Sequence, residues 1–261
     1  MVRRYREGRY IAGRYMDVAL YPVFPSARRR KNKFRPSTEG QRRLNAVNAE
    51  NRLLRLLHAN FTEADLEIHL TYAEDRLPRG EDEIRRDLQN WIRRVKRLYA
   101  AQGLPLKYIA VTERGQQSGR VHFHVTLSGG VDRDRLEKLW GRGYANSRRL
   151  QFDDNEGLRR LCGYIFARDR KDSGVWKKRW NASKNLVQPE YRQATGRVSA
   201  RRMERIFFSA DAAELERLYP GYRVTGVRFV YNDINDGFYI HARFVAEPGK
   251  RVKRKRREAE Q

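Results

Sequence analysis

The chain has 261 residues, with 57 Lys or Arg against 32 Asp or Glu, a formal net charge of +25 and a pI near 10.6. This excess of positive charge predicts a polyanionic partner, most often nucleic acid. The single cysteine, Cys162, excludes an internal disulfide and any cysteine-rich zinc module. We see no secretory signal and no apolar run that would cross a bilayer, and therefore expect a cytoplasmic protein that does not engage membranes.

The N-terminal quarter of the chain is rich in arginine. Residues 1–60 are expected to form a basic arm, with its densest run at Arg28–Lys33, that ends in a helix near residues 39–58. Beyond it, the alternation of apolar and polar residues over Leu66–Tyr72 predicts a half-buried strand. Apolar residues then recur at helical spacing over residues 81–102, which predicts an amphipathic helix.

Two apolar segments, at residues 106–113 and 121–128, flank a turn-rich stretch and predict a hairpin. The further elements that we expect are a short helix at 132–140, a strand at 144–152, a helix at 155–169, a basic irregular stretch at 170–200, a short helix at 211–218 and a terminal hairpin formed by 224–231 and 238–245.

This order of elements predicts an α+β fold in which helices flank a central antiparallel β-sheet. We expect three regions: a basic arm with its helix (1–60), a central domain (61–246) that includes the basic stretch and the terminal hairpin, and a disordered basic tail (247–261). The basic run of the tail, Lys250–Arg257, and that of the arm fit non-specific contacts with phosphates. The alternative is that both are solvated segments that only aid solubility.

The stretch Val121–Val125 carries two of the five histidines of the chain. A strand turns successive side chains to opposite faces, so His122 and His124 share one face while the apolar residues share the other. Two imidazoles on one face indicate a metal site, although a bare His-x-His pair also arises by chance on exposed strands. An ion such as Mg²⁺ or Mn²⁺ needs a hard oxygen ligand, for which Glu113 at the end of the neighbouring strand is the candidate.

The role of Glu113 depends on strand register. If Glu113 lies opposite His122, it joins the histidine face of the sheet. If it lies opposite Val121, it points into the core, where desolvation penalises a carboxylate. A slip of one residue exchanges these outcomes, and the sequence leaves both open.

Tyr164 falls to the side of the apolar stripe on the helix expected at 155–169. Arg160 and Arg168 lie about one turn away on the same flank. Cations in this position would bind a phosphodiester and favour phenolate over phenol, which makes Tyr164 a candidate nucleophile. The alternative is an interfacial tyrosine whose hydroxyl reaches solvent.

Three short motifs in a fixed order resemble those of the HUH endonucleases, the rolling-circle replication initiators of small phages, plasmids and prophages. The similar segments, which together span about residues 64–190, are Leu70–Tyr72 with Asp75–Pro78, Thr112–Gly115 with Gly119–His124, Gly163–Phe166, and Trp180–Leu186. The family often has lysine three residues after the tyrosine, where this chain has Ala167, so Arg168 is the candidate substitute despite being a poor proton donor. No second tyrosine lies within one turn of Tyr164, so the resemblance is to single-tyrosine members.

The resemblance implies an HUH domain, similar to an RNA-recognition motif, that nicks and rejoins single-stranded DNA at an origin through a 5′-phosphotyrosine. It implies Tyr164 and Arg168 as catalytic residues and Mg²⁺ or Mn²⁺ held by the metal ligands Glu113, His122 and His124. The residues expected to contact DNA are Thr71, Arg120, Arg160, Lys171 and Lys184.

The partners expected from the resemblance are single-stranded DNA or an origin hairpin, and a host helicase and polymerase in a bacterial cytoplasm, with a homodimer left open. Two alternatives remain: a non-catalytic nucleic-acid-binding protein and a single-tyrosine HUH transposase. His69 shares a strand face with Thr71 and is interpreted as a surface histidine more readily than as a groove residue. The aromatic residues Trp176, Trp180 and Tyr191 either stack on unpaired bases or anchor a long loop.

Overall fold

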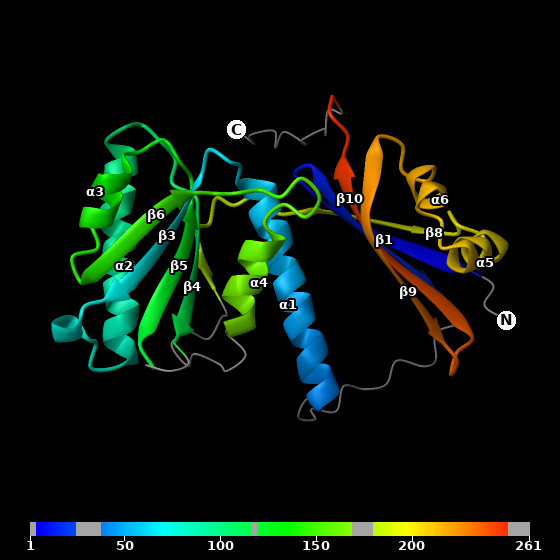
Figure 1. Cartoon of the computed structure of the whole chain (residues 1–261), viewed down its shortest axis with the longest axis horizontal. Helices are drawn as coiled ribbons and strands as arrows, with labels where there is room; N and C mark the ends of the chain where they lie inside the picture. Colours follow the sequence, from blue (N-terminus) through cyan, green and yellow to red (C-terminus); the bar gives the residue numbers. More distant parts are fainter. Residues whose placement is uncertain (1–3, 25–37, 116–118, 169–179, 250–261) are drawn as a thin grey trace, which may run out of the picture. The chain divides into compact units, whose positions relative to one another are not determined.

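The computed structural model describes residues 4–24, 38–115, 119–168 and 180–249. The chain divides into two compact units, and Figure 1 shows a β-sheet in each. One unit is Val47–Val187, which we call the central unit. The other combines both ends of the chain, Met1–Ala46 and Gln188–Gln261, and we call it the terminal unit.

The central unit is built on a five-stranded antiparallel sheet with the strand order β6-β3-β5-β4-β7. Its strands are β3 (Leu66–Tyr72), β4 (Tyr108–Arg114), β5 (Val121–Leu127), β6 (Gly143–Arg149) and β7 (Asn181–Ala182). Its helices are α1 (Glu39–Asn60, which begins in the terminal unit), the 3-10 turn η1 (Glu74–Arg76), α2 (Glu81–Ala100), α3 (Arg133–Lys138) and α4 (Arg159–Arg168).

One face of the central sheet packs against α2 and α3, which lie together on the same side in Figure 1. Alternate residues of β3 and β5, such as Leu70 and Phe123, are fully buried there against Trp91 of α2 and Trp140, which follows α3. The alternation of these two strands therefore supplies half of each strand to a core. The other half of each strand points to the opposite face.

That opposite face packs in part against α1 and α4. Ile109 and Val111 of β4 lie in one buried cluster with Leu57 of α1 and with Cys162 and Ile165 of α4. Helix α4 is thereby held against β4, the strand that also carries Glu113. This contact decides which side chains of α4 come near β5.

The terminal unit has a second five-stranded antiparallel sheet, with the order β8-β1-β2-β10-β9. Its elements are β1 (Tyr5–Ala12), β2 (Tyr15–Pro22), β8 (Glu190–Thr195), α5 (Ala200–Ser209), α6 (Ala212–Glu216), β9 (Tyr222–Asn232) and β10 (Gly237–Ala246). Met16, Val18 and Leu20 alternate into its core, where they pack with Met203 and Ile206 of α5.

The predicted α+β class, with antiparallel strands flanked by helices, is confirmed, although there are two sheets and not one. The predicted division into regions is wrong. Residues 5–22 are a hairpin and not a basic arm, because every second residue of β2 is apolar and the arginine content of β1 concealed the pattern. The C-terminal hairpin joins β2 through β10, so it does not belong to the domain expected at 61–246.

The stretch 170–200 was expected to be irregular, but in its described part it supplies β7 and β8. Helix α5 was not predicted at all. The basic runs at Arg28–Lys33 and Lys250–Arg257 lie outside the described residues. Across the ranges that the structure covers, no helix has both the length and the hydropathy needed to span a bilayer.

Candidate active site

Strand register brings the polar residues of three strands onto the face of the central sheet that α4 partly covers. Glu113 of β4 lies opposite His122 of β5, which settles the alternative that the sequence left open. On the other side of β5, Thr71 of β3 pairs with His122 and His69 pairs with His124. The polar cluster therefore has three adjacent strands as its floor, with β5 in the middle.

His124 is the centre of this cluster and is only 4% exposed. Its Nε2 lies 3.0 Å from Oε2 of the buried Glu113, and since a carboxylate accepts, Nε2 donates this hydrogen bond. Its Nδ1 makes no hydrogen bond, and the nearest carboxylate oxygen, Oε1 of Glu67, is 3.7 Å away. Burial alone would lower the pKa of His124, but the carboxylates of Glu113 and Glu67 raise it above its ordinary value.

Glu67 links the cluster to the outer strand β6. Its carboxylate pairs with Nη2 of Arg148 at 2.8 Å, and the glutamate side chain is buried while the arginine is largely exposed. Burial would raise the pKa of Glu67, yet the contacts with His124 and Arg148 hold it below its ordinary value. Glu67 is therefore a buried anion whose charge is shared between a solvent-facing arginine and the central imidazole.

His69 and His122 complete the group of imidazoles. The His69 ring stacks on His124 with centroids 4.6 Å apart and lies 5.2 Å from the ring of His122. Oγ1 of Thr71 is 3.2 Å from Nδ1 of His122. Burial, reinforced by the neighbouring histidines His124 and His122, lowers the pKa of His69 to about 4. The interpretation of His69 as a surface histidine is therefore wrong, because β3 presents it to the same face as the pair on β5.

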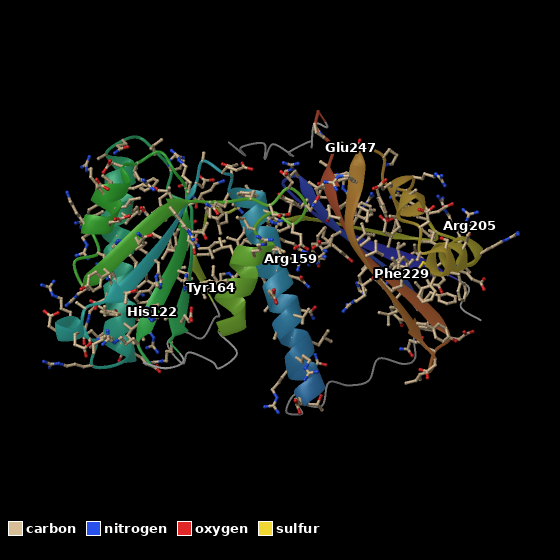
Figure 2. All side chains as sticks on the ribbon, viewed as in Figure 1. His122, Arg159, Tyr164, Arg205, Phe229 and Glu247 are labelled. Atoms are coloured by element: carbon tan, nitrogen blue, oxygen red, sulfur yellow. The ribbon has the colours of Figure 1, made fainter. Side chains whose placement is uncertain are left out.

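Tyr164 approaches the cluster from above the sheet. Leu158, Cys162 and Ile165 fix the buried side of the α4 segment, which leaves the tyrosine on its flank and 44% exposed. Its ring meets that of His124 in a T-shaped arrangement, with centroids 5.5 Å apart and planes at 83°. Figure 2 shows Tyr164 on the side of α4 that faces the strand of His122. The expected nucleophile and the expected metal ligands are thus neighbours.

The donor set is suited in kind to a divalent cation, because two imidazole nitrogens and a carboxylate are common metal ligands. Within the described ranges, no three His, Cys, Asp or Glu side chains converge in a metal-binding arrangement. The reason is visible at His124, whose Nε2 donates to Glu113 and cannot ligate a cation while that bond persists. The residues fit a metal after a rotation of the Glu113 carboxylate.

The residues expected to contact DNA have different settings. Thr71 lies within the cluster, and Arg120, just before β5, hydrogen-bonds to Glu74. Arg160 is exposed on α4, and Lys184 is exposed after β7. Lys171 and the side chain of Arg168 lie outside the described residues.

The aromatic residues of the stretch 170–200 also differ from one another. Trp180 is partly buried against the core below α1 and α4, so it is a packing residue. Tyr191 belongs to the terminal unit and lies on β8. Trp176 is outside the part of the chain that the structure covers.

Glu67 is the member of the cluster that sequence reasoning missed. The signal was present, because Glu67, His69 and Thr71 alternate with the apolar residues of β3 and so must share one face. What the alternation did not reveal is that β3 lies next to β5. That adjacency places Glu67 beside His124.

Residues 66–173 match a family model whose description is that of a replication-associated protein, of the ORF2 type. The matched segment begins at the first residue of β3 and includes Glu113, both histidines of β5 and Tyr164. It covers less than half of the chain, and neither the curated proteins nor the solved structures contain a significant match. The match supports a role in the initiation of DNA replication.

Proposed function

We propose that this protein is an HUH-type nicking and joining enzyme that acts on single-stranded DNA at a replication origin. The observation that carries the proposal is the T-shaped contact between Tyr164 and His124, beside the hydrogen bond from His124 to Glu113. It joins the only described tyrosine of α4 to the cluster on β5. The match of residues 66–173 to a replication-associated family gives independent support.

In the proposed reaction, Oη of Tyr164 attacks the phosphorus of a phosphodiester in line. A bond forms between this oxygen and phosphorus, the bond to the 3′-oxygen breaks, and the phenolic proton is lost while the 3′-oxygen gains one. The products are a 5′-phosphotyrosine and a free 3′-OH. Because the number of phosphodiester bonds is conserved, the reverse attack by a 3′-OH rejoins DNA without ATP.

Within this proposal, His122, His124 and Glu113 would hold Mg²⁺ or Mn²⁺, which would polarise the phosphate and offset its developing charge. The chain itself orients these ligands. Glu67 lies beside the second nitrogen of His124, and Thr71 beside that of His122. Arg160 on α4, one turn from Tyr164, is positioned to bind a DNA phosphate. The 3′-OH would then be extended by a host polymerase, with a host helicase opening the duplex.

The test is a search for a covalent protein–DNA species. Full-length protein is incubated with Mn²⁺ and pools of single-stranded oligonucleotides, labelled in parallel at the 3′ or the 5′ end, and resolved under denaturing conditions. A 5′-phosphotyrosine keeps the 3′-labelled fragment on the protein and releases the 5′-labelled one. The opposite labelling pattern, or adducts with neither label, contradicts the proposal and favours a non-catalytic nucleic-acid-binding protein.

The matched variants are Tyr164→Phe and Tyr144→Phe. Tyr144 lies on β6 of the same sheet and is 76% exposed, so its hydroxyl is a fair control for a general loss of tyrosine. Tyr164→Phe should abolish the adduct and retain binding of single-stranded DNA, whereas Tyr144→Phe should form the adduct normally. Adduct that persists in Tyr164→Phe removes Tyr164 from the reaction.

A further inference from the structure

The sheet of the terminal unit has one face without a covering layer among the described residues. Its other face packs against α5 and α6, which lie on the same side of the sheet in Figure 1. The uncovered side, which we call the open face, follows from the strand registers. It comprises Arg6, Gly8 and Tyr10 of β1, Asp17, Ala19 and Tyr21 of β2, Tyr191, Gln193 and Thr195 of β8, Gly226, Arg228 and Val230 of β9, and Tyr239, His241 and Arg243 of β10.

The open face differs in chemistry from the apolar side that meets α5 and α6. It carries four tyrosines and three arginines against one aspartate, with valine as its only large aliphatic residue. Every one of its side chains is half-buried or exposed. The face is therefore aromatic and net positive, which suits a polyanion and does not suit a second apolar protein surface.

A glycine on β1 lets one aromatic ring lie flat on this sheet. A Cβ built at Gly8 would lie 3.0 Å from Oη and 3.5 Å from Cε2 of Tyr191, so the phenol ring lies directly above the glycine. The ring of Tyr10 is 4.7 Å away, centroid to centroid. Tyr191 is nevertheless 48% exposed. One side of its ring is thus supported by the sheet while much of the residue faces solvent.

A second glycine does the same for an arginine. A Cβ built at Gly226 would lie 2.6 Å from Nη2, 3.1 Å from Nε and 3.2 Å from Cζ of Arg243, which pairs with it across β9 and β10. The guanidinium therefore lies over the glycine. A planar guanidinium held in this way presents a stacking surface as a ring does.

Hydrogen bonds along the β8 edge hold neighbouring side chains in place. Nε2 of Gln193 donates to Oη of Tyr21 at 3.2 Å, and Nε of Arg6 donates to Oγ1 of Thr195 at 3.2 Å. Side chains that are already ordered lose less entropy when a ligand binds. The open face is preorganised at the strand that carries Tyr191.

We propose that the open face binds single-stranded DNA. Unpaired bases stack on Tyr191, Tyr10 and Arg243, while the guanidinium groups of Arg6 and Arg228 contact phosphates. Sheets that present aromatic residues on one face take two or three unpaired bases in this manner, and the stacking tolerates any sequence. The choice of DNA over RNA rests on the proposed function, in which this second site holds the strand that the nicking site cuts.

The test is fluorescence anisotropy with a labelled oligothymidylate and full-length protein. Tyr191→Ala should raise Kd by roughly 10-fold, within the range expected for the loss of one stacked base, whereas Tyr191→Phe should bind as the parent protein does. The matched control is Phe208→Ala, since Phe208 lies on α5 and is 71% exposed. An equal Kd for Tyr191→Ala and Phe208→Ala overturns the proposal.

Charge and backbone variants provide a second test that does not depend on tyrosine. Arg228→Gln should weaken binding and flatten its salt dependence, whereas Arg201→Gln, an exposed change on α5, should do neither. Gly226→Ala displaces the Arg243 guanidinium without removing it and should also weaken binding. If Gly226→Ala and Arg228→Gln both bind like the parent protein, the open face is not the site.

The two proposals can fail separately. Absence of the covalent adduct in the parent protein, together with weaker binding by the open-face variants, rejects the nicking enzyme and keeps the binding face. A normal adduct with unchanged binding by those variants does the reverse. Tighter binding of oligouridylate than of oligothymidylate by the same face rejects DNA as its ligand.

Discussion

The rings of Tyr164 and His124 meet at 83° with their centroids 5.5 Å apart, although one comes from a helix and the other from the sheet below it. T-shaped ring pairs contribute about 0.5–1.5 kcal/mol beyond the area that they bury. His124 is further held by Glu113 and by the stacked ring of His69. The contact ties the position of α4 to that of the polar cluster, and the predictions below test the cluster and its supports.

Replacing Glu113 with Gln tests the proposed cation site. The amide keeps the shape of the side chain and can still accept from His124, but it removes the negative charge that a divalent ion would need. We expect the Mn²⁺ concentration for half-maximal adduct formation to rise by about 10-fold or more. Glu74→Gln, at an exposed acid that pairs with Arg120, is the control and should leave that concentration unchanged. An unchanged metal dependence in Glu113→Gln would exclude the residue from the ligand set.

His58, at the end of α1, predicts a loss of stability in acid. Its Nε2 accepts a hydrogen bond from the backbone N–H of Leu158 at 3.0 Å, so the neutral ring is the one that fits. Burial, reinforced by the charge of Arg159, lowers the pKa of His58 from 6.5 to about 3. The unfolded chain therefore binds a proton more readily, and the contribution of His58 is complete above pH 6.5 and declines as pH falls towards 3.

The measurement is urea unfolding of the parent protein and of His58→Gln at a series of pH values. All four tryptophans of the chain lie within Val47–Val187, so tryptophan fluorescence reports on the central unit alone. The difference in stability between the two proteins should shrink as the pH falls below 6.5. A difference that is constant with pH would contradict the proposed origin in His58.

Phe123 separates the two histidines of β5 and points to the opposite face, where it is fully buried between Tyr72 and Trp140. Phe123→Ala should lower the free energy of unfolding by about 3–5 kcal/mol, because it removes a large apolar side chain and leaves a cavity. The fluorescence-detected urea transition measures this loss. Phe208→Ala, which alters an exposed ring of the terminal unit, should leave the same transition in place.

Arg160 and Lys184 are expected to contact phosphates and to do little else. Replacing either with Gln should reduce the slope of log K against log salt by roughly 0.7 for single-stranded DNA, with no change in stability. Lys96→Gln is the matched control, because Lys96 is exposed on α2, which packs on the opposite face of the sheet. If the slope for Arg160→Gln equals that for Lys96→Gln, Arg160 does not contact the DNA backbone.

Strand and helix patterns were readable from the sequence wherever the periodicity was strong. The alternation in β3 and β5 and the helical spacing in α2 predicted these elements within a few residues of their observed bounds. The prediction for residues 5–22 was wrong because their arginine content outweighed a weaker alternation. Arginines on the two faces of β1 pair with Glu7 or lie on the open face, so a charged strand can still belong to a sheet.

Local backbone geometry determined that His122 and His124 would share a face, since side-chain direction in a strand depends only on position along it. The sequence also determined that Tyr164 would leave the apolar stripe of its helix. Only the tertiary structure decided that Glu113 lies opposite His122, that Glu67 and His69 lie beside His124, and that Tyr164 reaches the same ring. Register, strand order and helix docking depend on packing between distant segments, and so does the second sheet, which pairs both ends of the chain.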